Sequence, residues 1–291
     1  MRTIHLLLIS WVVVIWGLNF IAIKWALNDM SPLLLNALRF LFASIPAVFF
    51  IKPPKIPLKQ LLLYAVLMFM LQFSLLFTGI QAGIPAGVAS LILQTQVFFT
   101  LLLAIIFLGE KPTIVQIFGG CVAFSGIALV AVNSPDGLTF LGFILIILAA
   151  ITWGTGNFIT KKMGQINMLS LVVWSSFLSW PPLLLLVILI DGPQVVWQSV
   201  QDISWLSLFS LLYISYAATL FGASAWSWLV SRYPLSMIAP FTLSVPVIAL
   251  LSAGYLLDEP LHDWKIIAAL LVIGGLCINI ISAAVRNAKI S

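Results

Sequence analysis

The chain has 291 residues, of which 63% are hydrophobic and 7% charged, which excludes an ordinary soluble domain, where about a quarter of residues carry charge. Its net charge of +5 is spread over the loops, so no basic face for nucleic acid is present. Cys121 and Cys277 fall inside apolar runs without metal or redox spacing, and we expect no metal and no cofactor. The composition predicts an all-α integral membrane protein, because a helix satisfies its own backbone polar groups in lipid.

Ten apolar segments follow one another along the chain. Each has about the ~20 residues that a helix needs to cross the hydrocarbon core. The third and fourth are separated by Gln81–Pro85, where the proline is suited to open the next helix. The predicted transmembrane helices are His5–Lys24, Leu33–Ile51, Leu61–Ile80, Ala86–Leu108, Ile114–Val132, Phe140–Thr160, Met168–Ile190, Ile203–Ala225, Ser236–Leu257 and Trp264–Ser282.

The basic residues predict the orientation of these helices. With the N-terminus in the cytoplasm, ten spans return the C-terminus to the cytoplasm and alternate the loops consistently. Most acidic residues then lie outside. The cytoplasmic side receives ten of the 13 Lys and Arg residues: Arg2, Lys52, Lys55, Lys59, Lys111, Lys161, Lys162, Arg232, Arg286 and Lys289.

An internal repeat divides the chain into two similar units. The run Trp16-Gly17-Leu18-Asn19-Phe20 returns as Trp153-Gly154-Thr155-Gly156-Asn157-Phe158, which places the two asparagines 138 residues apart. Further along, an offset of 149 pairs Pro85 with Pro234, Glu110 with Glu259 and Gly126 with Gly275. Residues 1–133 and 138–285 therefore form two repeats of five helices. Because five is odd, the second repeat is expected to be inverted in the membrane, as in many transporters.

These motifs resemble the EamA-type branch of the drug/metabolite transporter superfamily over essentially the whole chain. The resemblance rests on the early Trp-Gly-x-Asn-Phe, on Leu38-Arg39-Phe40, on Leu108-Gly109-Glu110-Lys111 and on Leu257-Asp258-Glu259-Pro260. Within that branch, the run 85–96 looks like that of bacterial exporters of O-acetylserine and cysteine. The resemblance implies a secondary transporter that exports small amino-acid metabolites by alternating access. Since sister members export other amino acids, purines or drugs, the substrate class stays open.

The expected partners follow from the same resemblance. They are a small-molecule substrate and membrane lipid, with a homodimer as an option and no nucleic acid.

Aromatic rings beside amides mark both copies of the repeated motif. Trp16 shares a helix face with Asn19, and Trp153 shares one with Asn157. Such a face either lines a substrate cavity or joins helices through the amide, and both interpretations stand. The motif glycines are expected to loosen or break their helices near the site. They are Gly17, Gly154 and Gly156.

Three glutamines lie near the middle of the third and fourth segments, where an unpaired amide is costly. Gln94 and Gln96 correspond in the second repeat to Leu243 and Val245, which are apolar. The repeat therefore does not require these amides, and this favours a substrate-binding role for Gln94. For Gln96 and Gln72, binding and helix packing are equally compatible with the sequence.

Two basic residues and two tyrosines complete the candidate site. Arg39 lies seven residues into the second segment, where it either reaches the outer surface, about 10 Å away, or anchors a substrate carboxylate. Lys24 raises the same alternatives at a helix end. Tyr213 and Tyr216 lie in the middle of the eighth segment, although aromatic hydroxyls favour the interfaces. They either line a cavity or bond between helices.

The acidic residues at the ends of two apolar segments are expected to have structural roles. Glu110 and Glu259 end the fourth and ninth segments, where a carboxylate opposes the helix dipole. We expect them to cap or pair with a neighbouring helix end. No apolar segment contains Asp or Glu at mid depth, so we expect no proton-carrying carboxylate there.

Other functional classes fit the sequence less well. A membrane enzyme would need a nucleophile and a base, but His5 and His262 lie at membrane edges. No GxxxxGK[ST] motif for nucleotide phosphates is present. A channel usually has a symmetric pore lining, whereas the polar residues here differ between the repeats. A non-transporting scaffold stays as the remaining alternative.

Overall fold

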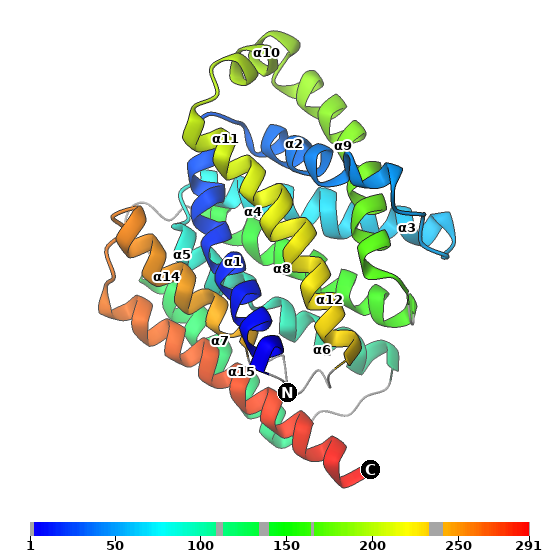
Figure 1. Cartoon of the computed structure of the whole chain (residues 1–291). Coiled ribbons are helices and arrows are strands. Elements are labelled where there is room, and N and C mark those ends of the chain that lie inside the picture. The colour runs from blue at the N-terminus through cyan, green and yellow to red at the C-terminus, as the bar shows by residue number, and fades with distance from the viewer. Residues whose placement is uncertain (1–2, 109–112, 134–139, 164–165, 233–240, 291) are drawn as a thin grey trace.

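The computed structural model describes residues 3–108, 113–133, 140–163, 166–232 and 241–290. Within these ranges the ordered elements are all helices, and no strand occurs. The helices form one bundle in which the chain begins and ends at the same end, with α10 at the opposite end (Figure 1). This arrangement agrees with the all-α class expected from composition.

The first half of the chain contains helices of 3 to 24 residues. Their bounds are α1 Thr3–Ala26, α2 Pro32–Ser44, η1 Ala47–Phe49, α3 Leu58–Ala65, η2 Val66–Leu71, α4 Gln72–Gln81, α5 Ala86–Leu93, α6 Gln96–Leu108 and α7 Ile114–Val132.

The second half follows a similar order. Its helices are α8 Phe140–Met163, α9 Met168–Ile190, α10 Pro193–Gln201, α11 Trp205–Leu212, η3 Tyr213–Gly222, α12 Ala223–Arg232, α14 Ser244–Leu256 and α15 Asp263–Ile290.

Membrane-spanning capacity can be judged from helix length and composition. In the described ranges, seven helices are long and apolar enough to cross a membrane, some of them joined from consecutive elements such as α3, η2 and α4. Two shorter apolar helices, Ala86–Phe99 and Ser244–Leu256, accompany them. A multi-pass membrane protein is therefore supported, and the count of ten stays a prediction.

Polar caps begin several of these helices. Ser31 accepts a hydrogen bond from the backbone N–H of Leu34, with Pro32 as the first helical residue of α2. Thr113 and Gln116 form a reciprocal capping box at the start of α7. Since the first four N–H groups of a helix lack intrahelical partners, such caps satisfy them at the ends of the apolar segments.

The close crossing of α7 and α15 depends on two glycines. A Cβ atom on Gly126 would lie 2.8 Å from the carbonyl oxygen of Ala268. A Cβ atom on Gly275 would meet the backbone of Gly119 and Ala123. Gly119 and Ala268 are themselves 149 residues apart, as are Gly126 and Gly275. The two helices thus contact each other reciprocally through the residues that the repeat pairs.

Two π-helical stretches interrupt long helices at corresponding places. η2 follows the 8 residues of α3, and η3 follows the 8 residues of α11. A π-helical turn releases carbonyl groups from the usual ladder, and such turns often occur at functional sites. The fully buried Asn36 of α2 donates its side-chain amide to the carbonyls of Phe69 and Met70, at 3.1 and 3.3 Å, and so satisfies part of η2.

The prediction that the helices break at the motif glycines is wrong. Helices α1 and α8 run without interruption through them. Two of these glycines instead allow close packing, because a Cβ atom on Gly17 would lie 2.5 Å from the side chain of Ile248, and one on Gly156 would overlap Met68. The fourth segment is interrupted at Gln94 and Thr95, between α5 and α6, without a glycine or proline.

Candidate functional site

Two expected site residues meet the same π-helical stretch from different helices. The indole N–H of Trp16 on α1 donates to the carbonyl of Ala218 at 3.1 Å. The guanidinium Nε of Arg39 on α2 donates to the hydroxyl of Thr219 at 3.0 Å. Adjacent residues of η3 therefore receive one hydrogen bond from α1 and one from α2.

Arg39 is held inside the bundle rather than at its surface. It is only 4% exposed, so the expected reach to the outer surface is not observed. Its guanidinium carbon lies 3.8 Å from the ring centroid of Phe73, with Phe40 and Phe77 at 5.4 and 5.8 Å. Its Nη1 is buried without a hydrogen-bond partner among the described residues. The arrangement is a cation stacked on an aromatic face with a free donor.

The two repeated asparagines have different surroundings. Asn157 on α8 donates its side-chain amide to the Oε1 of Gln96 on α6 at 2.8 Å, which is the interhelical bonding foreseen as one alternative. Asn19 is 9% exposed, and its Oδ1 has no hydrogen-bond partner in the described part of the chain. In the second repeat the position of Gln96 is taken by Val245, 149 residues later, which offers no amide to Asn19.

The remaining expected residues are distributed along the bundle. Gln72 is 1% exposed, and its Nε2 has no partner in the described ranges. Gln94 is buried at the break between α5 and α6. Trp153 and Lys24 are half-buried on α8 and α1. Thus Gln72 directly precedes Phe73 under Arg39, whereas Lys24 lies near the end of α1.

The two tyrosines separate into different roles. The hydroxyl of Tyr213 donates to the carbonyl of Ile15 at 2.8 Å, which joins η3 to α1. This contact is the interhelical hydrogen bond that was one of its alternatives. Tyr216 is 39% exposed. Tyr213 of η3 therefore donates to the backbone of α1, and Trp16 of α1 donates to the backbone of η3. The two hydrogen bonds involve the neighbouring α1 residues Ile15 and Trp16.

The expected structural role of Glu259 is observed. Its Oε1 accepts a hydrogen bond from the backbone N–H of Ala86 at 2.8 Å, so it caps the start of α5. A carboxylate at a helix N-terminus complements the helix dipole. Glu110, its counterpart in the first repeat, lies outside the described residues.

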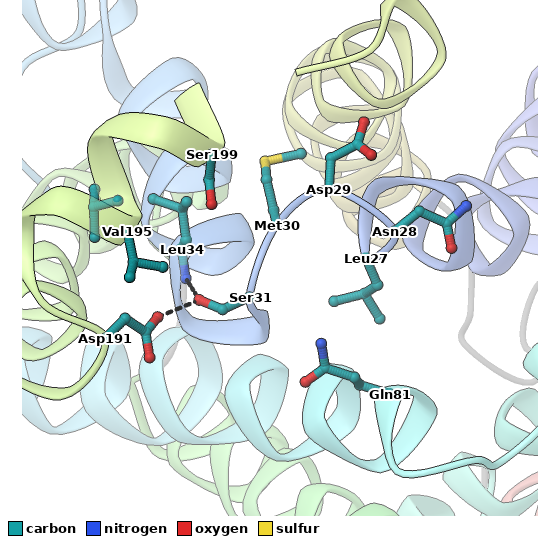
Figure 2. Close-up of a pocket in the computed structure, with 11 residues that line it drawn as sticks. Leu27, Asn28, Asp29, Met30, Ser31, Leu34, Gln81, Asp191, Val195 and Ser199 are labelled. Carbon is teal, nitrogen blue, oxygen red and sulfur yellow. Dashed lines mark hydrogen bonds between the residues drawn. The ribbon is translucent and has the colours of Figure 1, made fainter. Parts of the chain in front are cut away.

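A cavity of about 450 Å³ opens at the end of the bundle that carries α10. Ser31 donates its hydroxyl to Asp191 Oδ2 at 2.7 Å within it, and Val195 and Ser199 of α10 cover one side (Figure 2). Hydrogen bonding from Ser204 lowers the pKa of Asp29, another lining residue. None of the ten expected site residues lines this cavity.

The chemistry of the described side chains favours binding over bond-making. No group of three or more His, Cys, Asp or Glu that could hold a metal ion occurs among the residues described. Arg39 supplies a positive charge and free donors, Asn19 a free acceptor, and the aromatic rings apolar surface. These groups can bind a small molecule that carries a carboxylate.

Comparison with protein families gives a match over both halves of the chain. The model of the EamA-like transporter family matches residues 3–132 and 140–281. The chain belongs to the EamA-like transporter family. This membership agrees with the transporter resemblance that the motifs indicate, and it argues against an enzyme.

Two curated relatives cover nearly the whole EamA chain. One from Salmonella typhimurium, named a probable amino-acid metabolite efflux pump, is 40% identical over 95% of this chain and 94% of its own length. One from Escherichia coli with the same name is 38% identical over 95% of both chains. A solved structure, titled only as the crystal structure of a protein, aligns over 99% of this chain and 100% of its own with a TM-score of 0.68 and 14% identity, and so supports the fold alone.

Sequence reasoning missed two residues of this EamA protein that make hydrogen bonds to a π-helical stretch or to Arg39. Asn36 lies three residues before Arg39 on the same helix face, a spacing that could have drawn attention to it. Thr219 lies three residues after Tyr216, but a threonine within an apolar run gives little signal by itself. Each was found only through its hydrogen bond to a π-helical stretch or to Arg39.

Proposed function

We propose that the chain exports small amino-acid metabolites such as O-acetylserine and cysteine across the bacterial inner membrane by alternating access. The observation that carries the proposal is Arg39, a buried cation with one neutral side-chain partner and no Asp or Glu in the apolar segments to neutralise it. A buried charge without a counter-ion is costly. The carboxylate of an amino-acid metabolite supplies that counter-ion and suits the planar guanidinium. The names of the two curated relatives point to the same substrate class.

The other expected residues contact the remaining groups of the substrate in this proposal. In this proposal the side-chain oxygens of Asn19 and Gln94 accept from the substrate ammonium, and Trp16 and Trp153 face its body and cation. The further contributors are Lys24, Gln72, Asn157, Tyr213 and Tyr216. An exporter must also release its substrate, so the affinity is expected to be modest.

The proposed architecture has ten transmembrane helices in two inverted repeats, residues 1–133 and 138–285, with both termini in the cytoplasm. Support comes from the reciprocal glycine contacts of α7 and α15 and from the matching places of η2 and η3. The shared end of the two termini fits an even number of crossings (Figure 1). Reporter fusions after Lys59 and Arg232 should indicate the cytoplasm and fusions after Asp29 the periplasm. A reversal at any of these points would contradict the ten-span topology.

The experiment is efflux of labelled cysteine and O-acetylserine from liposomes that contain the purified protein. Wild type is expected to release both substrates, and Arg39→Gln to reduce release at least about tenfold, since a lost hydrogen bond to a charged group costs roughly 1.5–3 kcal/mol. Lys55→Gln is the matched control, because it removes one positive charge from an exposed loop. Equal release from Arg39→Gln and Lys55→Gln would exclude Arg39 from the site.

A second measurement separates binding from folding defects. Thermal unfolding of the wild type should shift upward with either substrate, whereas Arg39→Gln should retain its fold and lose the shift. Absence of efflux and of any shift for amino-acid metabolites, together with ion conductance in bilayers, would favour a channel instead.

A further inference from the structure

The aromatic surroundings of Arg39 fix its position only in part. The guanidinium carbon lies over the ring of Phe73, with Phe40 and Phe77 nearby. A ring face attracts the cation but does not choose the direction in which each edge of the guanidinium points. A directional contact is needed to fix this direction, and among the described residues the only hydrogen bond of the Arg39 side chain runs from Nε to Thr219.

The hydroxyl of Thr219 is itself oriented by the π-helical stretch. Its proton is donated to the carbonyl of Ile214, five residues earlier, at 2.8 Å. In an α-helix a threonine hydroxyl reaches the carbonyl three or four residues back, so the five-residue reach belongs to the π-helical geometry of η3. Because the single O–H is used in this bond, the oxygen faces Arg39 with its lone pairs and can only accept.

The backbone of η3 around Thr219 is also hydrogen-bonded to α1. Trp16 donates to the carbonyl of Ala218, the residue before Thr219, and Tyr213 donates to the carbonyl of Ile15. Both bonds tie η3 to α1. Thr219 therefore presents a fixed acceptor from a stretch of backbone held between α1 and α2.

The occupied Nε determines which donors stay available. Nη1 is buried and has no partner among the described residues, so at the Nη end of the guanidinium this donor is left for a ligand. A carboxylate offers two acceptor oxygens to such an edge and binds it in a bidentate manner. A carboxamide offers one oxygen and an NH₂ group, whose hydrogens oppose those of the guanidinium.

We propose that Thr219 is a positioning residue that turns the Nη edge of Arg39 toward the substrate and thereby sets the preference for a carboxylate over a carboxamide. This inference rests on the proposed function and deepens it. Thr219 does not touch the substrate in this scheme, and acts through Arg39.

The test compares an acid with its amide in three proteins. Efflux or thermal-shift titrations with O-acetylserine and its carboxamide give a ratio of apparent affinities for the wild type, Thr219→Val and Thr219→Ser. Valine keeps the shape of threonine and removes the hydroxyl, whereas serine keeps the hydroxyl. We expect the acid-over-amide ratio to fall about tenfold in Thr219→Val and to stay within about twofold of wild type in Thr219→Ser.

Each alternative outcome has a separate meaning. An unchanged ratio in Thr219→Val, or an equal loss of acid and amide that serine also shows, would overturn the positioning role. If Arg39→Gln abolishes the ratio while Thr219→Val preserves it, only the positioning inference fails. If the wild type binds neither compound, the proposed function itself fails.

Folding of the test variant is controlled by a second substitution. Thr219→Ala removes the hydroxyl without adding bulk, and it carries the same measurement if Thr219→Val does not accumulate. If both variants fail to fold while Thr219→Ser folds, the hydroxyl acts in folding rather than in selectivity, and the inference is overturned.

Discussion

Two adjacent glycines of α15 give a matched pair for testing the crossing with α7. At Gly275 an added Cβ would meet the carbonyl oxygen of Gly119 and the backbone nitrogen of Ala123, 2.5 Å away in the second case. At Gly274 an added Cβ would find no atom within 4 Å. The two alanine substitutions are chemically identical and one residue apart, so they differ mainly in what the new methyl group contacts.

The size of the effect follows from two opposing contributions. Alanine in place of glycine favours a helix interior by roughly 0.5–1 kcal/mol in either position. At Gly275 the neighbours are backbone atoms, which cannot turn aside as a flexible side chain would, and forcing extra volume into a packed contact costs about 1–3 kcal/mol. Because the helix contribution is common to both variants, their difference in unfolding free energy isolates the packing cost.

The assay is reversible unfolding in mixed micelles of a mild detergent and a denaturing one, followed by tryptophan fluorescence. Gly274→Ala should be as stable as wild type or more stable, and Gly275→Ala should be less stable than Gly274→Ala by about 1–3 kcal/mol. Equal stability of the two variants would refute the close backbone crossing of α7 and α15 at this point.

Three further outcomes test the contacts at other helices. Glu259→Ala should lower the free energy of unfolding by about 1–2 kcal/mol, because the N–H of Ala86 loses its cap. Glu259→Gln should cost less, because its amide oxygen still accepts this hydrogen bond. Unfolding of both variants and of the wild type measures the difference. Asn36→Leu should lose about 1–2 kcal/mol in the same assay relative to Asn28→Leu, an exposed control, and equal stability would contradict the pairing with η2. The lowered pKa of Asp29 means that its charge stabilises the fold above the ordinary value of 3.8 and that this contribution is lost as pH falls through the folded-state pKa. Asp29→Asn should therefore be less stable than wild type at neutral pH and equal to it in acid, and a gap that persists in acid would contradict the assignment.

The sequence carried enough information for the fold class and for part of the site. Apolar runs and the lack of charge are sufficient to predict membrane helices, because lipid imposes one backbone solution. A charged residue inside such a run stands out, so Arg39 could be predicted as a candidate, and the repeated motif did the same for Trp16. The capping role of Glu259 could be foreseen for a similar reason, since a carboxylate at the end of its own helix needs a partner elsewhere.

Other features of the structure could not be predicted from the sequence. In a membrane protein both the lipid face and the core face of a helix are apolar, so periodicity does not distinguish them. Neither the π-helical stretch η3 nor the break at Gln94 contains a proline, and η3 receives hydrogen bonds from α1 and α2 that the sequence does not reveal. The prediction of helix breaks at the motif glycines was wrong because a glycine can either loosen a helix or admit a close neighbour. The sequence does not distinguish these roles, whereas the position of Ile248 beside Gly17 shows close packing.

The isolation of Arg39 from any carboxylate has a consequence for the response to membrane voltage. In the proposed export no Asp or Glu of the apolar segments carries a proton, so the net charge that crosses the membrane is that of the substrate. A zwitterion that pairs its carboxylate with Arg39 crosses without net charge, so the voltage does no work on it and its export follows its concentration gradient. A substrate with an acylated amine carries one negative charge, and leaving a negative interior yields about 2.3 kcal/mol per 100 mV, or roughly a fiftyfold concentration ratio. The proposed site would then accumulate N-acylated substrates outside the cell, whereas substrates with a free amine, O-acetylserine included, would only equilibrate.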